Sequence, residues 1–180
     1  AGAMATAITV NTPIDNERNG NCSLREAIRS ANANNQGFDA CPQGTGVVDT
    51  IVLQSGVTYN LNRVGDDSTA INGDLDIDDD LIIIGNGATI DGNGAVTQDR
   101  VLEVLSGVIV DISNVTVTDG RSFGGSGIIS RGSMTLSGVS IIGNAGFDAG
   151  AAVQVTGNGA SATLIDTSIS NNSGPDHGGL

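Results

Sequence analysis

The sequence has no tryptophan and no lysine, and only one tyrosine, one histidine and three phenylalanines occur among its 180 residues. A core without large aromatic side chains must be filled by Val, Ile, Leu and Ala, which suits small stacked layers better than one bulky interior. The sequence also has no nucleophile elbow, phosphate-binding loop or CxxC-type zinc motif. It therefore contains no motif that by itself predicts catalysis or nucleotide binding.

Positive charge is scarce as well. Twenty acidic residues, seventeen of them Asp, face seven arginines, and the formal charge is −13. Such a chain repels nucleic acid and anionic lipid, so neither is an expected partner. No apolar run is long enough to span a membrane. Asp favours tight turns, so turns and solubility explain the excess, while divalent-cation binding and adaptation to a salty medium are the alternatives.

The only two cysteines are Cys22 and Cys41. A disulfide between them would close a loop of about 20 residues and stabilise the fold by about 3 kcal/mol in the chain-entropy model. Because disulfides persist in oxidising compartments, this pairing favours an extracellular protein. Two buried free thiols are the alternative.

One segment reads as the start of a helix. Ser23 and Glu26 have the spacing of a capping box, in which each side chain bonds to the backbone of the other residue. Apolar residues follow at helical spacing, at Leu24, Ala27, Ile28 and Ala31. The pattern predicts a helix from Leu24 to about Asn34 that lays one apolar face on the end of a stack of strands.

The remainder consists of short alternating strands that repeat. Ile90, Val117, Ile141 and Ile169 take equivalent places, 27, 24 and 28 residues apart. A second file aligns Ile84, Ile112, Leu136 and Leu164. A period in the twenties is typical of a β-solenoid, and the chain lacks the Asn frame of leucine-rich repeats. We predict an all-β, right-handed parallel β-helix of about five coils with an N-terminal capping helix. Asn144 and Asn172 are candidates for an Asn ladder.

The expected organisation has three parts. Residues 1–4 resemble the remnant of an expression tag, residues 5–48 form the cap, and residues 49–180 form the coils. The final residues, Gly178–Leu180, resemble the opening of another repeat, so we expect the native chain to continue. An open last coil would favour self-association.

The heptapeptide Cys22–Ile28, CSLREAI, followed by Ala31–Ala33, resembles the CSLREA domain. Residues Thr9–Asn11 and the Asn-Gly-Asn before Cys22 also match. That family opens secreted or surface-anchored bacterial proteins with right-handed parallel β-helix bodies. The rest of the chain resembles generic pectate-lyase-like β-helix repeats. The resemblance implies a cap and an extracellular or cell-surface location, without implying a reaction.

These observations predict the capping segment and first coils of a surface scaffold, adhesin or glycan-binding module. Its partners would be glycans or other surface proteins. The alternative is the front part of a carbohydrate-active enzyme, a polysaccharide lyase or glycoside hydrolase.

A calcium loop is one candidate site. Oxygen-bearing side chains and a glycine match positions 1, 3, 5, 6, 7, 9 and 12 of an EF-hand-like loop at Asp15, Glu17, Asn19, Gly20, Asn21, Ser23 and Glu26. Glu17 departs from the usual Asp or Asn, and no helix precedes the loop. The alternative is the plain capping box, in which Glu26 faces its own backbone.

A second candidate is the acidic run Asp74–Asp80. On a strand, Asp76 and Asp78 would point the same way, roughly 6.5–7 Å apart. This lies between the carboxylate separations of retaining and inverting glycosidases, so the two could form an acid/base pair. The simpler interpretation is a solvated outer face with Leu75 and Ile77 turned inward, and a bridging cation is the intermediate case.

A third set contains the turn residues Asp91, Asp119 and Arg121, with Arg100 and Arg131 nearby in the repeat. Asp and basic residues occur on one long face of β-helix polysaccharide lyases. Ordinary turn salt bridges are the simpler interpretation here.

Overall fold

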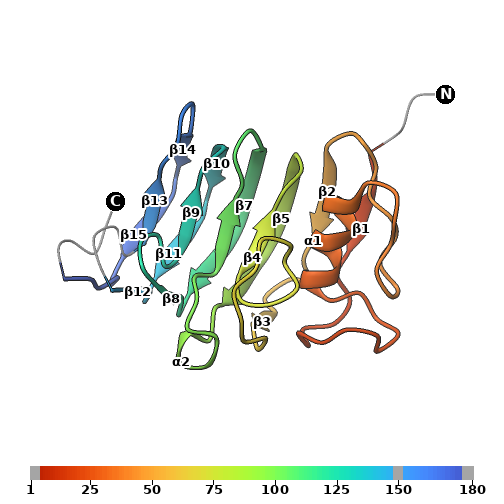
Figure 1. Ribbon diagram of the computed structural model, residues 1–180, viewed down its shortest axis with the longest axis horizontal. Helices are drawn as coiled ribbons and strands as arrows, with labels where there is room; N and C mark the ends of the chain where they lie inside the picture. The colour runs from red at the N-terminus through yellow and green to blue at the C-terminus, as the bar shows by residue number, and fades with distance from the viewer. Residues whose placement is uncertain (1–4, 148–151, 176–180) are drawn as a thin grey trace.

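The computed structural model describes residues 5–147 and 152–175. It is a parallel β-solenoid of about four turns, fewer than the five predicted. Figure 1 shows the coils side by side along the long axis of the molecule, with β1 and α1 at one end and β14 at the other. The sequence-based expectations for residues 1–4 and Gly178–Leu180 concern residues outside these ranges.

Two helices and fifteen strands make up the described chain. In order they are β1 (Ala7–Thr9), α1 (Leu24–Ala33), β2 (Asp49–Val52), β3 (Thr58–Asn60), β4 (Leu75–Ile77), β5 (Leu81–Asp91), α2 (Gly94–Thr97), β6 (Leu102–Val104), β7 (Ile109–Thr118), β8 (Arg121–Ser122), β9 (Ile128–Ser130), β10 (Ser133–Ser137), β11 (Ser140–Ile142), β12 (Ala145–Gly146), β13 (Val153–Val155), β14 (Ser161–Ile165) and β15 (Ser168–Ser170).

Every strand pairing in the described chain is parallel, and three sheets result. The main sheet runs β1-β2-β5-β7-β10-β14, with β3, β11 and β15 pairing beside it. A second sheet runs β4-β6-β9-β13, and β8 pairs with β12. Parallel neighbours place equivalent residues of successive repeats directly above one another. The two long strands each pair with two shorter strands of a neighbouring coil: β5 with β2 and β3 of the preceding coil, and β7 with β10 and β11 of the next coil.

Stacked aliphatic files fill the interior. One inward file contains Ile8, Ile51, Ile83, Ile112, Leu136 and Leu164. The predicted file of Ile90, Val117, Ile141 and Ile169 is confirmed, and Tyr59 extends it at its N-terminal end. In each file, every coil contributes one aliphatic side chain to the interior. Such small, regular layers do not need a side chain as large as Trp, which is consistent with its absence from the sequence.

One member of the predicted alignment is wrong. Ile112 pairs with Ile83, and Ile84 pairs with Ser113. Between Ile84 and Ala88 the chain advances four residues, while its partner advances only two, from Ser113 to Val115. The Asn86-Gly87 corner, where both residues have positive φ, absorbs this difference. Since side chains alternate along a strand, a slip of one residue moves Ile84 from the core face to the outer face.

The predicted Asn ladder is present. Asn144 is fully buried, and its Nδ2 donates to Oδ1 of Asn172 at 3.0 Å and to the carbonyl of Val117 at 3.2 Å. Its Oδ1 accepts the backbone N–H of Gly120 at 2.9 Å. One side chain thus joins three successive coils at a corner.

Replacing Asn144 by Ala should destabilise the fold by about 1–3 kcal/mol, because the Val117 carbonyl and the Gly120 N–H of the preceding coil lose their partner, and so does the Asn172 side chain of the next coil. Chemical denaturation measures this difference. Ser168→Ala is the matched control, since its exposed hydroxyl makes only one hydrogen bond, to Ser140 in the preceding coil. Equal losses in the two variants would contradict a structural role for the ladder.

Candidate functional site

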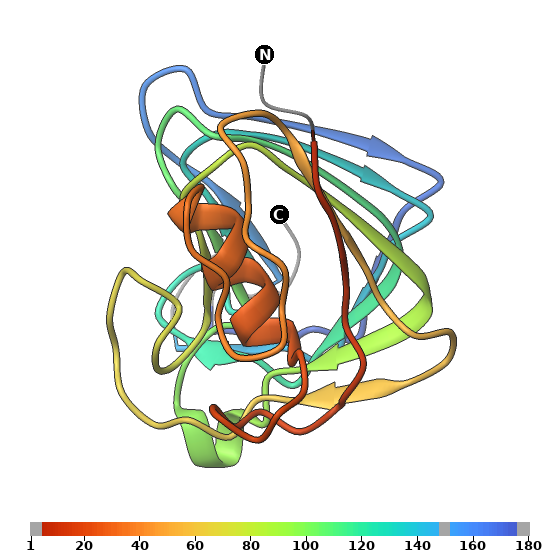
Figure 2. The same ribbon diagram turned by 90° about the vertical axis from the view of Figure 1, so that its right-hand side faces the viewer.

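The capping helix forms as predicted. Ser23 accepts from the Glu26 N–H, and Glu26 accepts from the Ser23 N–H, so both halves of the capping box are present. The stripe residues Leu24, Ala27, Ile28 and Ala31 are buried. Figure 2 looks along the solenoid from this end and shows α1 lying across the opening of the first coil. The predicted disulfide between Cys22 and Cys41 is also formed.

Arg25 is the residue that sequence reasoning missed in this cap. Its side chain is 1% exposed, and it pairs with Asp15 through two bonds, from Nε at 2.7 Å and from Nη2 at 3.1 Å. The remaining donors reach three carbonyls of the loop before β4: those of Ala70, Gly73 and Asp74. All five guanidinium donors are satisfied in this buried position. No periodicity marks Arg25, because it flanks the apolar stripe of α1.

The proposed calcium-loop residues have protein partners. Asp15 pairs with Arg25, while Glu17 pairs with Arg29 and Arg63. Glu26 serves the capping box and accepts the Arg18 N–H.

Asn19 and Asn21 bond to each other within the loop. Within the described residues, the loop carboxylates do not converge as a group of three. Of the two interpretations of Glu26, the capping box is the one seen.

Asp76 and Asp78 do not form the predicted pair. β4 ends at Ile77, so the alternation that would place both carboxylates on one face stops before Asp78. Asp78 is exposed, whereas Asp76 is 1% exposed and accepts the Ala70 N–H at 2.9 Å. The solvated-face interpretation is therefore also wrong for Asp76, although Leu75 and Ile77 do point into the core.

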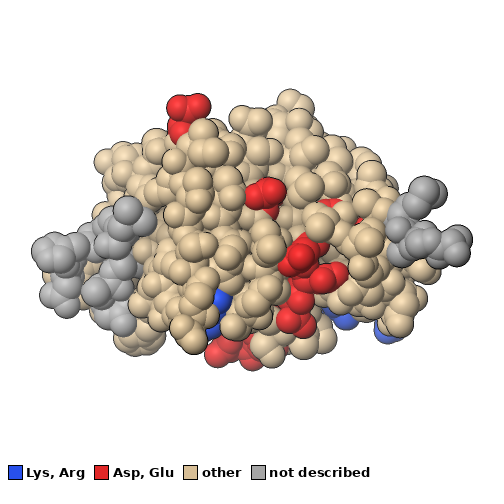
Figure 3. All heavy atoms as spheres, turned by 90° about the horizontal axis from the view of Figure 1, so that it is seen from above, with Lys and Arg blue, Asp and Glu red and all other residues tan. Residues whose placement is uncertain are grey.

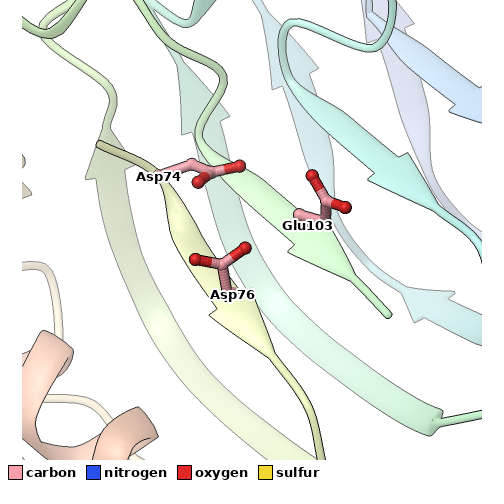
Figure 4. A group of neighbouring side chains, drawn as sticks. All are labelled: Asp74, Asp76 and Glu103. Atoms are coloured by element: carbon pink, nitrogen blue, oxygen red, sulfur yellow. The ribbon is translucent and has the colours of Figure 1, made fainter. Parts of the chain in front are cut away.

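Asp76 belongs instead to a buried acidic cluster with Asp74 and Glu103. Within the described chain, these three are the only group of acidic, His or Cys residues whose ligand atoms gather closely, all within 4.8 Å of one another. Asp76 and Glu103 are register partners on β4 and β6, and Asp74 immediately precedes β4. Figure 4 shows the three carboxylates side by side on one face of these strands. Asp76 and Glu103 are 27 residues apart, the same separation as Ile90 and Val117, so the repeat period contained a signal for this pairing that the sequence-based prediction did not use.

Two arginines border this acidic cluster. Arg100 Nη1 contacts Asp74 Oδ2 at 3.2 Å and also bonds to Glu103. Arg131 bonds to the other oxygen of Glu103. Asp99 lies beside them, and its Oδ2 accepts the Asp74 N–H at 3.2 Å. Arg100 and Arg131 thus form ion pairs with the acidic cluster, and not with the turn residues Asp91 and Asp119 of the third predicted set.

Burial changes the acid–base behaviour of the cluster. It raises the pKa of Asp74 to about 8, with added repulsion from Asp99 and Asp76 that Arg100 only partly offsets. Burial also raises the pKa of Asp76 to about 6, against the stabilising hydrogen bond from Ala70. Both carboxyls therefore bind protons in the folded state at pH values where the unfolded chain has released them.

The folded protein should lose stability as pH rises from about 4 to above 8, because Asp74 then ionises in a buried place that disfavours its charge. Asp74→Asn removes this cost. In chelator at pH 9, we expect the variant to exceed the wild type in unfolding free energy by at least about 1.4 kcal/mol, the equivalent of one pKa unit. Near pH 4 the two proteins should be similar. Asp78→Asn, at an exposed carboxylate, should show no such divergence, and parallel pH profiles for Asp74→Asn and wild type would refute the prediction.

A groove of about 470 Å³ lies next to the cluster, and Asp99 and Arg100, which border the cluster, line it. Its wall contains Phe123 and Phe147, whose ring centroids are 5.0 Å apart. Phe123 is 71% exposed, so its ring is accessible from solvent. Asp66 and Gln98 add polar groups to the lining. A concave surface that combines apolar rings with a few polar side chains is typical of a small-molecule or sugar site.

Comparison with known proteins identifies no relative. No family model, curated protein or solved structure matches this chain. The resemblance to the CSLREA domain thus rests on the sequence motif. Among the described residues, neither helix has the length and apolar character needed to cross a bilayer.

Proposed function

We propose that this chain is the N-terminal capping segment and first coils of an extracellular β-solenoid protein that serves as a surface scaffold, adhesin or glycan-binding module. The observation that carries the proposal is the sealed first coil. α1 buries its apolar stripe over the opening, and Arg25 ties it to the loop before β4. Such a cap blocks edge-to-edge pairing at the start of the stack and sets its register.

The cap also supports the extracellular location. Its disulfide joins the residue before the N-cap to the segment that follows the helix, and such bonds persist outside reducing compartments.

The strongly acidic composition disfavours nucleic acid as a partner. Acidic side chains also outnumber basic ones on the face in Figure 3.

Glycans or other surface proteins are the partners we propose. The groove beside Phe123 supports a glycan, since an exposed ring offers a stacking surface and the neighbouring carboxylate, amide and guanidinium groups can bond to hydroxyls.

Self-association of the chain is a further proposal. Leu136 is fully buried, whereas its register partner Leu164 on the last described coil is 38% exposed, so this coil presents an apolar surface on which a second copy could stack.

The rival proposal, the front part of a carbohydrate-active enzyme, has less support. Glycosidases place two carboxyl groups on either side of a substrate bond that both can reach. Here Asp74 and Asp76 are each 1% exposed, and neither lines the groove. Binding without turnover is therefore the expected activity of the groove.

A glycan-array screen followed by calorimetry and a reducing-end assay, with and without calcium, tests the groove. We expect binding without depolymerisation, and at least about tenfold weaker binding in Phe123→Ala. Ile109→Ala is the control, because Ile109 is 57% exposed but does not line the groove. Turnover that disappears in Asp76→Asn would overturn the proposal in favour of an enzyme.

Protease treatment of intact producing cells tests the location. Surface display predicts that the chain is cleaved or released while cytosolic markers remain intact. Complete protection of the chain on intact cells, with cleavage after lysis, would contradict an extracellular function.

A further inference from the structure

We propose that the acidic cluster of Asp74, Asp76 and Glu103 is a binding site for one divalent cation, with calcium as the fitting ion. This site is separate from the calcium loop suggested by residues 15–26. The proposal does not depend on the function of the groove.

The first argument is geometric. Each of the three residues offers a carboxylate oxygen, and these oxygens lie within 4.8 Å of one another. Calcium binds oxygen at 2.3–2.6 Å, so ligands on opposite sides of one ion are about 5 Å apart. The three oxygens can therefore share one calcium ion without rearrangement of the backbone. Waters and neighbouring carbonyls commonly complete its coordination.

The second argument is an unsatisfied atom. Asp74 is 1% exposed, and its Oδ1 has no hydrogen-bond partner. A buried polar atom without a partner is rare and costs free energy, so it indicates an additional group at that place. Asp74 Oδ2 is already held by Arg100, which leaves Oδ1 as the oxygen available to an ion.

Charge supplies a third argument. Asp74, Asp76, Glu103 and the adjoining Asp99 bring four carboxylates to this place, and Arg100 and Arg131 bring two guanidinium groups. When these six groups are ionised, they leave an excess of two negative charges in a mostly buried position, and Asp67 adds further repulsion at Asp76. One divalent cation would neutralise this excess, whereas a single additional arginine or monovalent ion would not.

The ion has a route to the site. Asp99 and Arg100 belong both to the border of the cluster and to the lining of the adjacent groove. The Glu103 side chain is 12% exposed, and that of Arg100 is 17% exposed. Ions can thus approach from the groove without opening the core.

Calorimetric titration of calcium chloride into the chelator-stripped chain at pH 8 tests the proposal. We expect one site per chain and a melting temperature that rises with calcium by at least about 4 °C at saturation. Binding should weaken at least about tenfold in Asp76→Asn and Asp74→Asn. Asp78→Asn, an exposed neighbour in the same acidic run, should bind as the wild type does.

Several outcomes would overturn the site. No heat and no thermal shift in the wild type would indicate a water molecule or a proton in the cluster instead. Equal binding in Asp76→Asn and Asp78→Asn would indicate diffuse attraction to an acidic surface. Loss of binding in Glu17→Gln, with retention in Asp76→Asn, would move the ion to the N-terminal loop. Should Asp74→Asn fold poorly, Glu103→Gln and the wild-type titration still decide the matter.

Discussion

Replacing Arg25 by Met lowers the free energy of unfolding by about 3–5 kcal/mol, the loss expected when one partner of a buried ion pair is removed. Asp15 is left as a nearly buried carboxylate, 5% exposed, without its guanidinium partner. Three inward carbonyls, including those of Ala70 and Gly73, lose their donors at the same time. Chemical denaturation of the intact chain measures the loss.

Besides lowering the free energy of unfolding, replacement of Arg25 should loosen the loop before β4. Ala70 has a φ of +53°, a left-handed backbone conformation that is unfavourable for alanine and persists only where neighbours hold it. Without Arg25, the loop before β4 should relax, and its amides should exchange hydrogen faster. Arg25 thus links the cap to the acidic cluster, since it also contacts the Asp74 carbonyl, and Asn32 of α1 adds a second link by donating to the Asp76 carbonyl.

Arg18→Met is the matched control, since Arg18 is exposed and only its backbone N–H makes a bond, to Glu26. We expect a change within about 0.5 kcal/mol for it. Adding Asp15→Asn to Arg25→Met should recover part of the loss, because the unpaired charge disappears. Similar stabilities of Arg25→Met and Arg18→Met would contradict the anchoring role of Arg25.

Removal of the disulfide by Cys22→Ala with Cys41→Ala should lower the free energy of unfolding by about 3 kcal/mol, since the bond closes a loop across a sequence separation of 19 residues. Both positions are buried, so alanine avoids placing a polar group in the core. Thermal melting with and without reductant measures the effect.

The bond also holds the returning segment against α1. Gly44 donates its N–H to the Ser30 carbonyl, and a Cβ at this glycine would lie only 2.3 Å from that oxygen. Opening of this contact should appear as faster hydrogen exchange near Gly44. Reductant should destabilise the wild type and leave the double variant unchanged, which separates loss of the bond from loss of packing. A wild type insensitive to reductant would contradict the prediction.

Features that depend on local spacing were predictable. The capping box needs only Ser23 and Glu26 three residues apart, and the solenoid follows from apolar positions that recur with a period in the twenties. The Asn144–Asn172 contact could be inferred in the same way, because parallel register places equivalent residues together. Ile84 was misassigned because the corner at Asn86-Gly87 has two additional residues, and a local pattern cannot show how a corner absorbs them.

Periodicity was sufficient to predict the stacked parallel coils and the apolar stripe of the cap. With only two cysteines in the chain, a single internal disulfide was possible, and the structure contains it. Which charged side chains are buried together became clear from the contacts between coils. The partner of Asp76 is Glu103 and not the predicted Asp78. Arg25 binds both Asp15 and the loop before β4. No regular spacing marks the partners of Arg25, because Asp15 and the three carbonyls lie in loops. Asp76 and Glu103 share the 27-residue spacing of Ile90 and Val117, but that spacing does not show that their side chains are buried, since burial depends on the contacts around them.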